Sequence, residues 1–180
     1  ALVEQNQGRI YHLALRMTGN PDDAAELCQE AFLNAWKGLG KFQGESSFST
    51  WLYRLTSNAC VDLLRREGRH RGAAGPSLND EESDLRLPDD APGPQEQAER
   101  RELREQIETA LQALTPEHRQ VLVLREMHQL SYDEIAQVLK LDVGTVKSRI
   151  NRGRKQLRNF LLKSGNFSPP AASKESGKEG

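Results

Sequence analysis

Apolar residues recur at helical spacing in the first third of the chain, in three segments separated by turn signals. We expect helices over roughly 1–18, 22–37 and 48–66. Asn20 and Pro21 mark the start of the second helix, because an Asn side chain can accept bonds from free backbone N–H groups and proline suits the first helical position. A loop rich in Gly and Ser, residues 38–47, separates the second helix from the third.

Periodicity disappears between about residues 68 and 95. Residues 72–94 hold four prolines and three glycines among acidic residues, which predicts a flexible, disordered linker. The helical pattern then returns, with turn signals and a capping box formed by Ser131 and Glu134 inside it. The last residues are again rich in Ser, Pro, Gly, Lys and Glu. We expect four more helices, over about 99–114, 116–128, 132–139 and 145–162, and a disordered tail at 164–180.

Because no segment predicts a strand, the fold class is expected to be all-α, with two small helical modules joined by a flexible acidic linker and a helix-turn-helix in the C-terminal module. Hydrophobic residues make up 36% and charged residues 28%, which suits small modules with large solvated surfaces. The expected boundaries are 1–67 for the first module, 68–97 for the linker, 98–163 for the second module and 164–180 for the tail.

The formal net charge of -1 hides a strong asymmetry along the chain. Residues 76–96 hold seven acids and one base, whereas residues 140–163 hold eight bases and one acid. A one-signed basic segment of this kind predicts a polyanionic partner for the C-terminal module.

Cysteine content and hydropathy bear on the compartment. The two cysteines, Cys28 and Cys60, lie in expected helices and are too few for a secreted disulfide framework. The longest wholly apolar run is Val121–Leu124, and no basic-then-apolar leader opens the chain. We therefore expect a cytoplasmic protein without membrane insertion. The chain starts at Ala1, without Met and inside a helical pattern, so the first module is expected to lack its beginning.

Residues 131–162 predict a helix-turn-helix. The second of its helices has an apolar face with Val146, Ile150 and Leu157, and the opposite side is polar and basic. Arg and Asn can read base edges in a major groove, and Lys can neutralise phosphates. The polar face holds the candidates Ser148, Asn151, Arg152 and Lys155, and its flanks hold Lys147, Arg149, Arg154 and Arg158. A solvated amphipathic helix is the alternative, but the one-signed charge favours DNA binding.

The turn of this motif departs from the common pattern. Lys140 stands where many helix-turn-helix turns have a glycine, so we expect Gly144 to supply the flexibility instead.

The expected third helix carries Arg54, Asn58 and Arg65 along one side, next to a loop rich in aromatic residues. This combination suits single-stranded nucleic acid, because bases stack on aromatic rings while cations follow the backbone. Trp51 itself has the spacing of a core residue. On the second helix, Phe32 and Leu33 are expected to be exposed beside acids, which indicates either a protein-binding surface or an ordinary solvated face.

These residues resemble a known family. The segments NPDDAAELCQEAFLNAWKGLGKF and SSFSTWLYRLTSNACVDLLRRE are similar to conserved region 2 of extracytoplasmic-function (ECF) sigma factors. The segment LTPEHRQVLVLREMHQLSYDEIAQVLKLDVGTVKSRINRGRKQLRNFL is similar to their region 4. The resemblance implies a transcription initiation factor that brings core RNA polymerase to promoters and aids DNA melting, and it covers most of the chain outside the linker and tail.

The resemblance also implies roles for residues and partners. The minus-35 contacts would be Thr145, Lys147, Ser148, Arg149, Asn151, Arg152 and Lys155. The minus-10 contacts would be Phe48, Trp51, Arg54, Asn58 and Arg65. The polymerase contacts would be Glu26, Gln29, Glu30 and Leu33. Implied partners are core polymerase, through its β′ clamp helices and β flap, promoter DNA and an anti-sigma factor.

Two other classes of protein are weighed against this one. A transcriptional regulator that binds duplex DNA without polymerase would explain the helix-turn-helix but leave residues 22–66 without a role. An enzyme is the weaker alternative, because the four histidines and two cysteines have no metal-ligand spacing and no nucleophile or phosphate-loop motif is present. No catalytic residue, metal or cofactor is expected.

Overall fold

The computed structural model describes residues 2–70 and 93–164, and it contains helices without any strand in these two ranges. The expected all-α class is confirmed. The helices of the first module are α1 (Leu2–Thr18), α2 (Pro21–Gly38), the short η1 (Leu39–Lys41) and α3 (Phe48–His70). Those of the second are α4 (Pro94–Gln112), α5 (Pro116–Leu122), the π-helical turn η2 (Val123–Met127), α6 (Tyr132–Leu139) and α7 (Val143–Lys163).

The predicted linker contains more helix at its two ends than its sequence pattern indicated. Helix α3 continues to His70, and α4 begins at Pro94 rather than near Glu99. Apolar periodicity is absent there, but proline at the first helical position and ion pairs one turn apart, such as Arg100 to Glu96 at 2.7 Å, support the helix. The rest of the predicted linker, and the tail from residue 165, lie outside the described residues.

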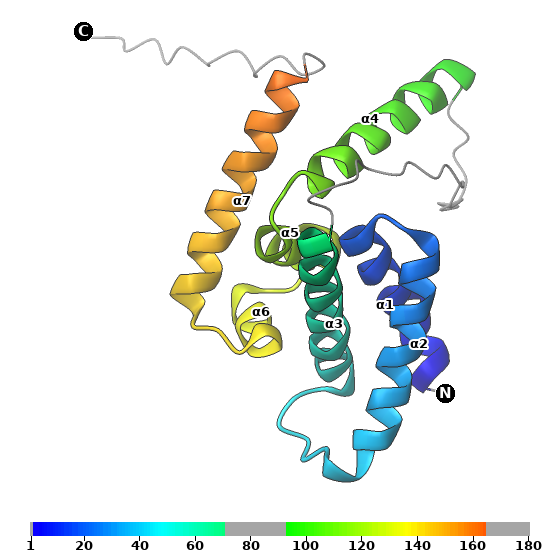
Figure 1. Ribbon diagram of the computed structural model, residues 1–180, viewed down its shortest axis with the longest axis vertical. Helices are drawn as coiled ribbons and strands as arrows, with labels where there is room; N and C mark the ends of the chain where they lie inside the picture. The colour runs from blue at the N-terminus through cyan, green and yellow to red at the C-terminus, as the bar shows by residue number, and fades with distance from the viewer. Residues whose placement is uncertain (1, 71–92, 165–180) are drawn as a thin grey trace, which may run out of the picture.

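The first module is a bundle in which α1, α2 and α3 pack on one another (Figure 1). Helix α2 begins as the sequence predicted, since the Asn20 side chain accepts hydrogen bonds from the backbone N–H groups of Asp22 at 2.8 Å and Asp23 at 3.3 Å. Leu13 and Leu52 are fully buried where α1 meets α3.

The second module has the predicted helix-turn-helix, built from α6 and α7. A capping box opens α6: Ser131 Oγ accepts from the N–H of Glu134 at 3.1 Å, and the Glu134 carboxylate accepts from the N–H of Ser131 at 2.7 Å. Val146 and Ile150 are fully buried, as their spacing predicted. They hold α7 against α5 and α6.

The turn between α6 and α7 corrects one expectation. Lys140 itself adopts the left-handed conformation, with φ 52° and ψ 48°, and its N–H bonds back to the carbonyl of Ala136. Gly144 lies inside α7, whose first residue is Val143, and so does not provide the turn. The reason is that Asp142 caps α7 and starts the helix before Gly144 is reached.

The two modules share one apolar core. Helix α3 lies between the α1–α2 pair and the helices α5 and α6 (Figure 1), and a single cluster of buried apolar residues extends through both modules. Arg119 of α5 is 4% exposed and donates to the carbonyl oxygen of Met17 at the end of α1, at 2.5 Å. A buried cation bonded across the boundary ties the second module to the first.

Candidate nucleic-acid interface

The N-terminal end of α7 is fixed by Asp142. Its carboxylate accepts from the backbone N–H of Thr145 at 2.8 Å and from the Thr145 hydroxyl at 2.5 Å. These bonds to Thr145 lower the pKa of the Asp142 carboxyl. Both hydrogen-bonding groups of Thr145 are thus used in the cap of α7, and this cap fixes where the residues that follow begin.

The solvent side of α7 carries the predicted basic face. Lys147, Asn151, Arg152 and Lys155 are exposed, whereas Ser148 and Arg149 are half-buried. Within the described part of the chain, the cations of Lys147, Arg152 and Lys155 make no hydrogen bond or ion pair with other side chains. The neighbouring Arg154 differs, because it donates to Glu126 at 2.9 Å. The unpaired cations form a surface that can approach phosphates and base edges.

Close packing against α5 keeps α7 in place. Gly153 is buried, and a Cβ built on it would lie 3.1 Å from Cγ of Leu122. The missing side chain lets the two helices approach, so the basic face is presented by a rigid element. The apolar spacing predicted Leu157 for this face, and Leu157 is half-buried there.

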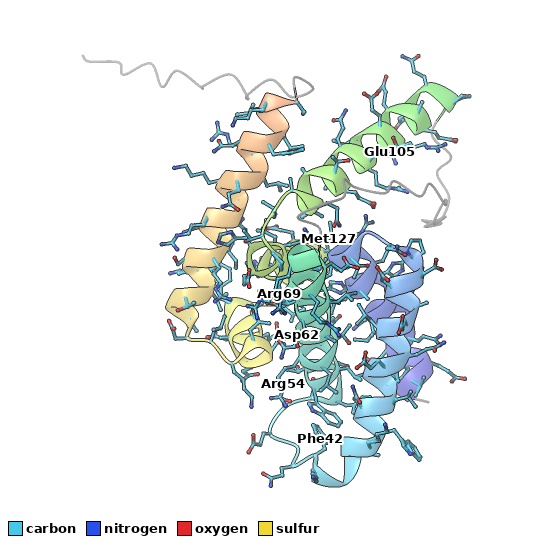
Figure 2. All side chains as sticks on the ribbon, in the orientation of Figure 1. Phe42, Arg54, Asp62, Arg69, Glu105 and Met127 are labelled. Carbon is cyan, nitrogen blue, oxygen red and sulfur yellow. The ribbon has the colours of Figure 1, made fainter. Side chains whose placement is uncertain are left out.

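The loop between η1 and α3 is built on an aromatic cluster. Phe42 stacks on Trp51 with ring centroids 4.9 Å apart, and Phe48 meets the same Trp51 edge-on at 6.0 Å. The indole also lies against Gly38, where an added Cβ would be 3.1 Å from the ring. Figure 2 shows Phe42 at the end of the molecule where α2 is joined to α3, with Arg54 farther along α3. The cluster holds the base of the loop in shape.

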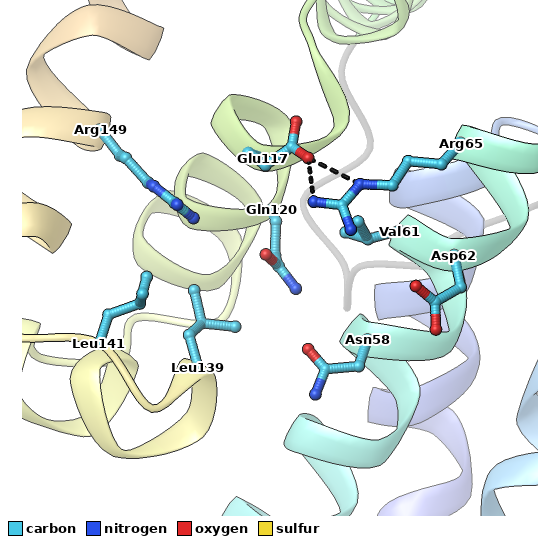
Figure 3. Close-up of a pocket in the computed structure, with 9 residues that line it drawn as sticks. All are labelled: Asn58, Val61, Asp62, Arg65, Glu117, Gln120, Leu139, Leu141 and Arg149. Atoms are coloured by element: carbon cyan, nitrogen blue, oxygen red, sulfur yellow. Dashed lines mark hydrogen bonds and ion pairs between the residues drawn. The ribbon is translucent and has the colours of Figure 1, made fainter. Parts of the chain in front are cut away.

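Asn58 and Arg65 lie away from this loop. They line a cavity of about 350 Å³ between α3 and the second module, together with Arg149 of α7 (Figure 3). Arg65 donates two hydrogen bonds to one carboxylate oxygen of Glu117, at 2.9 and 2.5 Å. The structure therefore brings Asn58, Arg65 and Arg149 together and separates the first two from the aromatic cluster.

Glu117 interacts with both arginines: Arg65 is bonded to it, and the charge of Arg149 acts on it. Burial on its own would raise the pKa of Glu117, but the hydrogen bonds from Arg65 and the charges of Arg65 and Arg149 bring this pKa below its usual value. The carboxylate is consequently ionised at neutral pH and attracts cations from both modules.

The outer face of α2 holds the other predicted site. Glu26, Gln29 and Glu30 are exposed, and Leu33 is 58% exposed. Phe32, in contrast, is half-buried and packs on the core, so its expected exposure is wrong. Phe32 follows the buried Cys28 by four residues and precedes the buried Ala35 by three, so it lies at the edge of the face that packs inward.

Sequence reasoning missed Trp36. Its side chain is 78% exposed, which makes it the most exposed large apolar residue in the described ranges. It follows Leu33 by three residues and Gln29 by seven, so it lies on the same helix face as both. That spacing was the available signal, and a tryptophan so exposed on an acidic face indicates a protein-binding surface.

Two further properties apply to the described residues alone. In ranges 2–70 and 93–164, no helix has both the length and the apolar character that crossing a membrane requires. The same ranges contain no group of three or more His, Cys, Asp or Glu residues arranged to hold a metal ion.

The chain joins a helix-turn-helix to a three-helix unit with an aromatic loop, and its two modules match the two regions of the sigma-70 class. Residues 2–70 match the family Sigma-70 region 2, and residues 104–157 match Sigma-70, region 4. The chain is 34% identical over 168 residues to the ECF RNA polymerase sigma factor SigW of Bacillus subtilis, covering 89% of this chain and 87% of SigW. The chain belongs to the family of ECF sigma factors.

Other relatives agree with this assignment. The chain is 40% identical over 162 residues to the ECF RNA polymerase sigma factor SigE of Mycolicibacterium smegmatis, and the match covers 90% of this chain but 61% of SigE. It is 37% identical over 164 residues to the RNA polymerase sigma-H factor of Pseudomonas aeruginosa, covering 89% of this chain and 84% of that protein.

Solved structures show the same fold. The sigma factor RpoE of Bartonella quintana, determined with the anti-sigma factor NepR, superposes with a TM-score of 0.67 at 22% identity, over 89% of this chain and 94% of that one. CnrH, determined with the cytosolic domain of CnrY, superposes with a TM-score of 0.64 at 26% identity, over 92% and 87% of the two chains.

Proposed function

We propose that this chain directs bacterial core RNA polymerase to specific promoters and helps to open their DNA. The observation that carries the proposal is the presence of both sigma regions in one chain, with an unpaired basic face on the helix that follows the turn. The protein acts in the cytoplasm, where polymerase and chromosome are, and it acts by binding, without covalent chemistry of its own.

Helix α7 reads the minus-35 element in this proposal. Lys147, Asn151, Arg152 and Lys155 are the exposed candidates. Arg152 can donate two parallel bonds to a guanine, and the lysines can neutralise phosphates. Ser148 and Arg149 stand at the edge of this face, and Thr145 supports it through Asp142.

The first module captures unpaired bases of the minus-10 element. Phe48 and Trp51 support the loop whose surface receives a base, because their rings are engaged with each other and with Phe42. Arg54, Asn58 and Arg65 are the polar contacts proposed along α3. Melting is then driven by the free energy of binding bases after they leave the duplex.

Polymerase is bound through the outer face of α2, which meets the β′ clamp helices, while the second module meets the β flap. Leu33 and Trp36 form the apolar part of this face, with Glu26, Gln29 and Glu30 around it. Large aromatic side chains contribute most of the binding energy at many protein interfaces. An anti-sigma factor is the proposed regulator, in keeping with the anti-sigma complexes of the structurally similar factors.

Transcription in vitro tests the proposal. Core polymerase is supplied with fragments of bacterial genomic DNA, with and without the protein. We expect transcripts that depend on the protein and that start downstream of shared two-part sites. If core polymerase neither binds the protein nor initiates, while free duplex does bind it, the protein is instead a regulator that works without polymerase.

Two variants locate the contacts. Arg152→Ala should weaken binding by about 1–3 kcal/mol and relax the minus-35 preference at one position, while Arg100→Ala on exposed α4 is the matched control. An unchanged preference would show that the orientation of α7 on DNA is wrong. Trp36→Ala should lower the affinity for core polymerase about tenfold or more, and Asn34→Ala, an exposed neighbour on α2, should not.

A further inference from the structure

The cavity beside α3 has the size and the lining of a small-molecule site. Its volume of about 350 Å³ lies at the lower end of the range for such sites, which is roughly 300–1,000 Å³. Polar side chains reach it from α3, α5 and α7, and leucines from the end of α6 and the turn after it (Figure 3). One small ligand fits this space, whereas a strand of nucleic acid or a peptide helix does not.

Gln120 is a buried polar residue whose side chain has no partner in the described part of the chain. It is 4% exposed and lies in α5 between the buried Arg119 and Val121. Arg119 donates to four oxygens, whereas the amide of Gln120 makes no hydrogen bond with any described residue. Figure 3 shows this amide pointing into the cavity. Because a buried amide is normally hydrogen-bonded, the partner of Gln120 is expected to come from outside the chain.

A second amide and two leucines face the same space. Asn58 of α3 also lines the cavity, and its side chain makes no hydrogen bond within the described ranges. An amide offers a donor and an acceptor together, which matches N6 and N7 of adenine with two bonds. Leu139 and Leu141 are half-buried on another side of the cavity, where a flat ring can pack against them. This part of the lining suits an adenine base.

Charge determines where an anionic group would lie. The guanidinium of Arg149 makes no hydrogen bond with the described residues, whereas Arg65 is bonded to Glu117 at 2.9 and 2.5 Å. Asp62 lies on the opposite side of the space from Arg149 (Figure 3). An anion is therefore attracted to Arg149 and repelled by Asp62, and a guanidinium can bind a phosphate through two parallel hydrogen bonds.

We propose that this cavity binds an adenine mononucleotide, with its base at the amides of Gln120 and Asn58 and its phosphate at Arg149. Inorganic phosphate could meet Arg149 but would leave both amides without a partner, and adenosine would leave Arg149 without an anion. The site goes beyond the proposed function, since neither polymerase nor promoter DNA takes part in it.

Calorimetric titration of the full chain tests the site. The probes are adenosine 5′-monophosphate (AMP), the corresponding guanine nucleotide (GMP), adenosine and inorganic phosphate. We expect a dissociation constant for AMP on the order of 10–100 μM. GMP and adenosine should bind about tenfold more weakly or worse, because each lacks one of the matched groups. Absence of AMP binding at about 5 mM, or equal affinity for GMP or for phosphate alone, would overturn the proposal.

Two variants test the assigned contacts. Gln120→Leu keeps a side chain of similar size but removes the amide, so the affinity for AMP should fall about tenfold or more. Gln95→Leu, at an exposed position on α4, is the matched control and should bind AMP as the wild type does. Arg149→Met should lower the affinity for AMP about tenfold and leave that for adenosine unchanged, because adenosine carries no phosphate.

Nuclear magnetic resonance of the wild-type chain needs no variant to fold. The side-chain amide signals of Gln120 and Asn58 should shift when AMP is added, while that of Gln95 should not. If these signals stay in place, or if both variants bind AMP like the wild type, the nucleotide binds elsewhere and the assigned site is wrong.

The outcomes also separate this site from the proposed function. The titrations need neither polymerase nor promoter DNA. If AMP binds as expected while the protein supports no promoter-specific transcription, the nucleotide site stands and the proposed function is wrong. If transcription depends on the protein while AMP does not bind, the proposed function stands and the nucleotide site is refuted.

Discussion

Replacement of Arg119 by methionine should remove a large part of the stability of the fold. The guanidinium is 4% exposed and donates to four oxygens. Nη1 reaches the carbonyl of Met17 at 2.5 Å and the side chain of Gln112 at 2.7 Å. Nη2 reaches the carbonyls of Gln112 at 2.9 Å and Leu114 at 3.0 Å. One side chain thus donates hydrogen bonds to backbone carbonyls at the C-terminal ends of both α1 and α4.

Methionine fills similar space but donates no hydrogen bond. Three backbone carbonyls then lose a donor, and each buried acceptor left without one costs about 1–3 kcal/mol. Release of the guanidinium from its buried site offsets part of this loss, because burial of a charge is itself unfavourable. The net loss in the free energy of unfolding should be about 3–5 kcal/mol, a large share of the roughly 5–15 kcal/mol typical of a native protein.

Urea unfolding followed by far-ultraviolet circular dichroism measures the loss. Arg119→Lys should fall between the wild type and Arg119→Met, since one ammonium cannot reach all four oxygens. Arg100→Met, at a side chain 60% exposed on α4, is the matched control and should change stability by less than about 0.5 kcal/mol. A loss below about 1 kcal/mol for Arg119→Met would refute the structural role assigned to these bonds.

Three further predictions concern pH, backbone and thiols. Burial lowers the pKa of His128 to about 4 from 6.5. The contribution of the neutral imidazole to the free energy of unfolding should therefore have its full value above pH 6.5. It should fall, by at most about 3 kcal/mol, as the pH drops toward 4. His128→Gln should show a shallower dependence in urea titrations at pH 7 and about pH 4, and an unchanged slope would contradict this. Lys140→Gly should stabilise the protein by about 0.5–1 kcal/mol in thermal unfolding, because φ is 52° there, whereas Lys147→Gly within α7 should destabilise it by about 1 kcal/mol. Burial raises the pKa of the Cys60 thiol to about 12, so a thiol reagent at neutral pH should modify Cys60 at the rate of unfolding; rapid labelling of native protein would show that α3 opens locally.

The sequence by itself determined the local elements. Asn20 and Ser131 each predicted a helix start, and both cap their helices as expected, because a cap depends on backbone groups two or three residues away. The spacing of Val146 and Ile150 likewise predicted their burial. The turn before α7 shows the limit of this reasoning. We expected Gly144 to provide the turn, but Lys140 adopts the left-handed conformation and Gly144 lies inside the helix that Asp142 caps.

Tertiary structure decided which side chains meet. Trp36 and Trp51 are the same residue type on neighbouring helices, yet the first is 78% exposed and the second stacks on Phe42. Arg65 was predicted as a DNA contact, and in the free chain it is bonded to Glu117 of the other module. Periodicity gives the face of one helix that is apolar, but it cannot give the helix that covers that face. That choice depends on the packing of residues far apart in the chain, which no local pattern encodes.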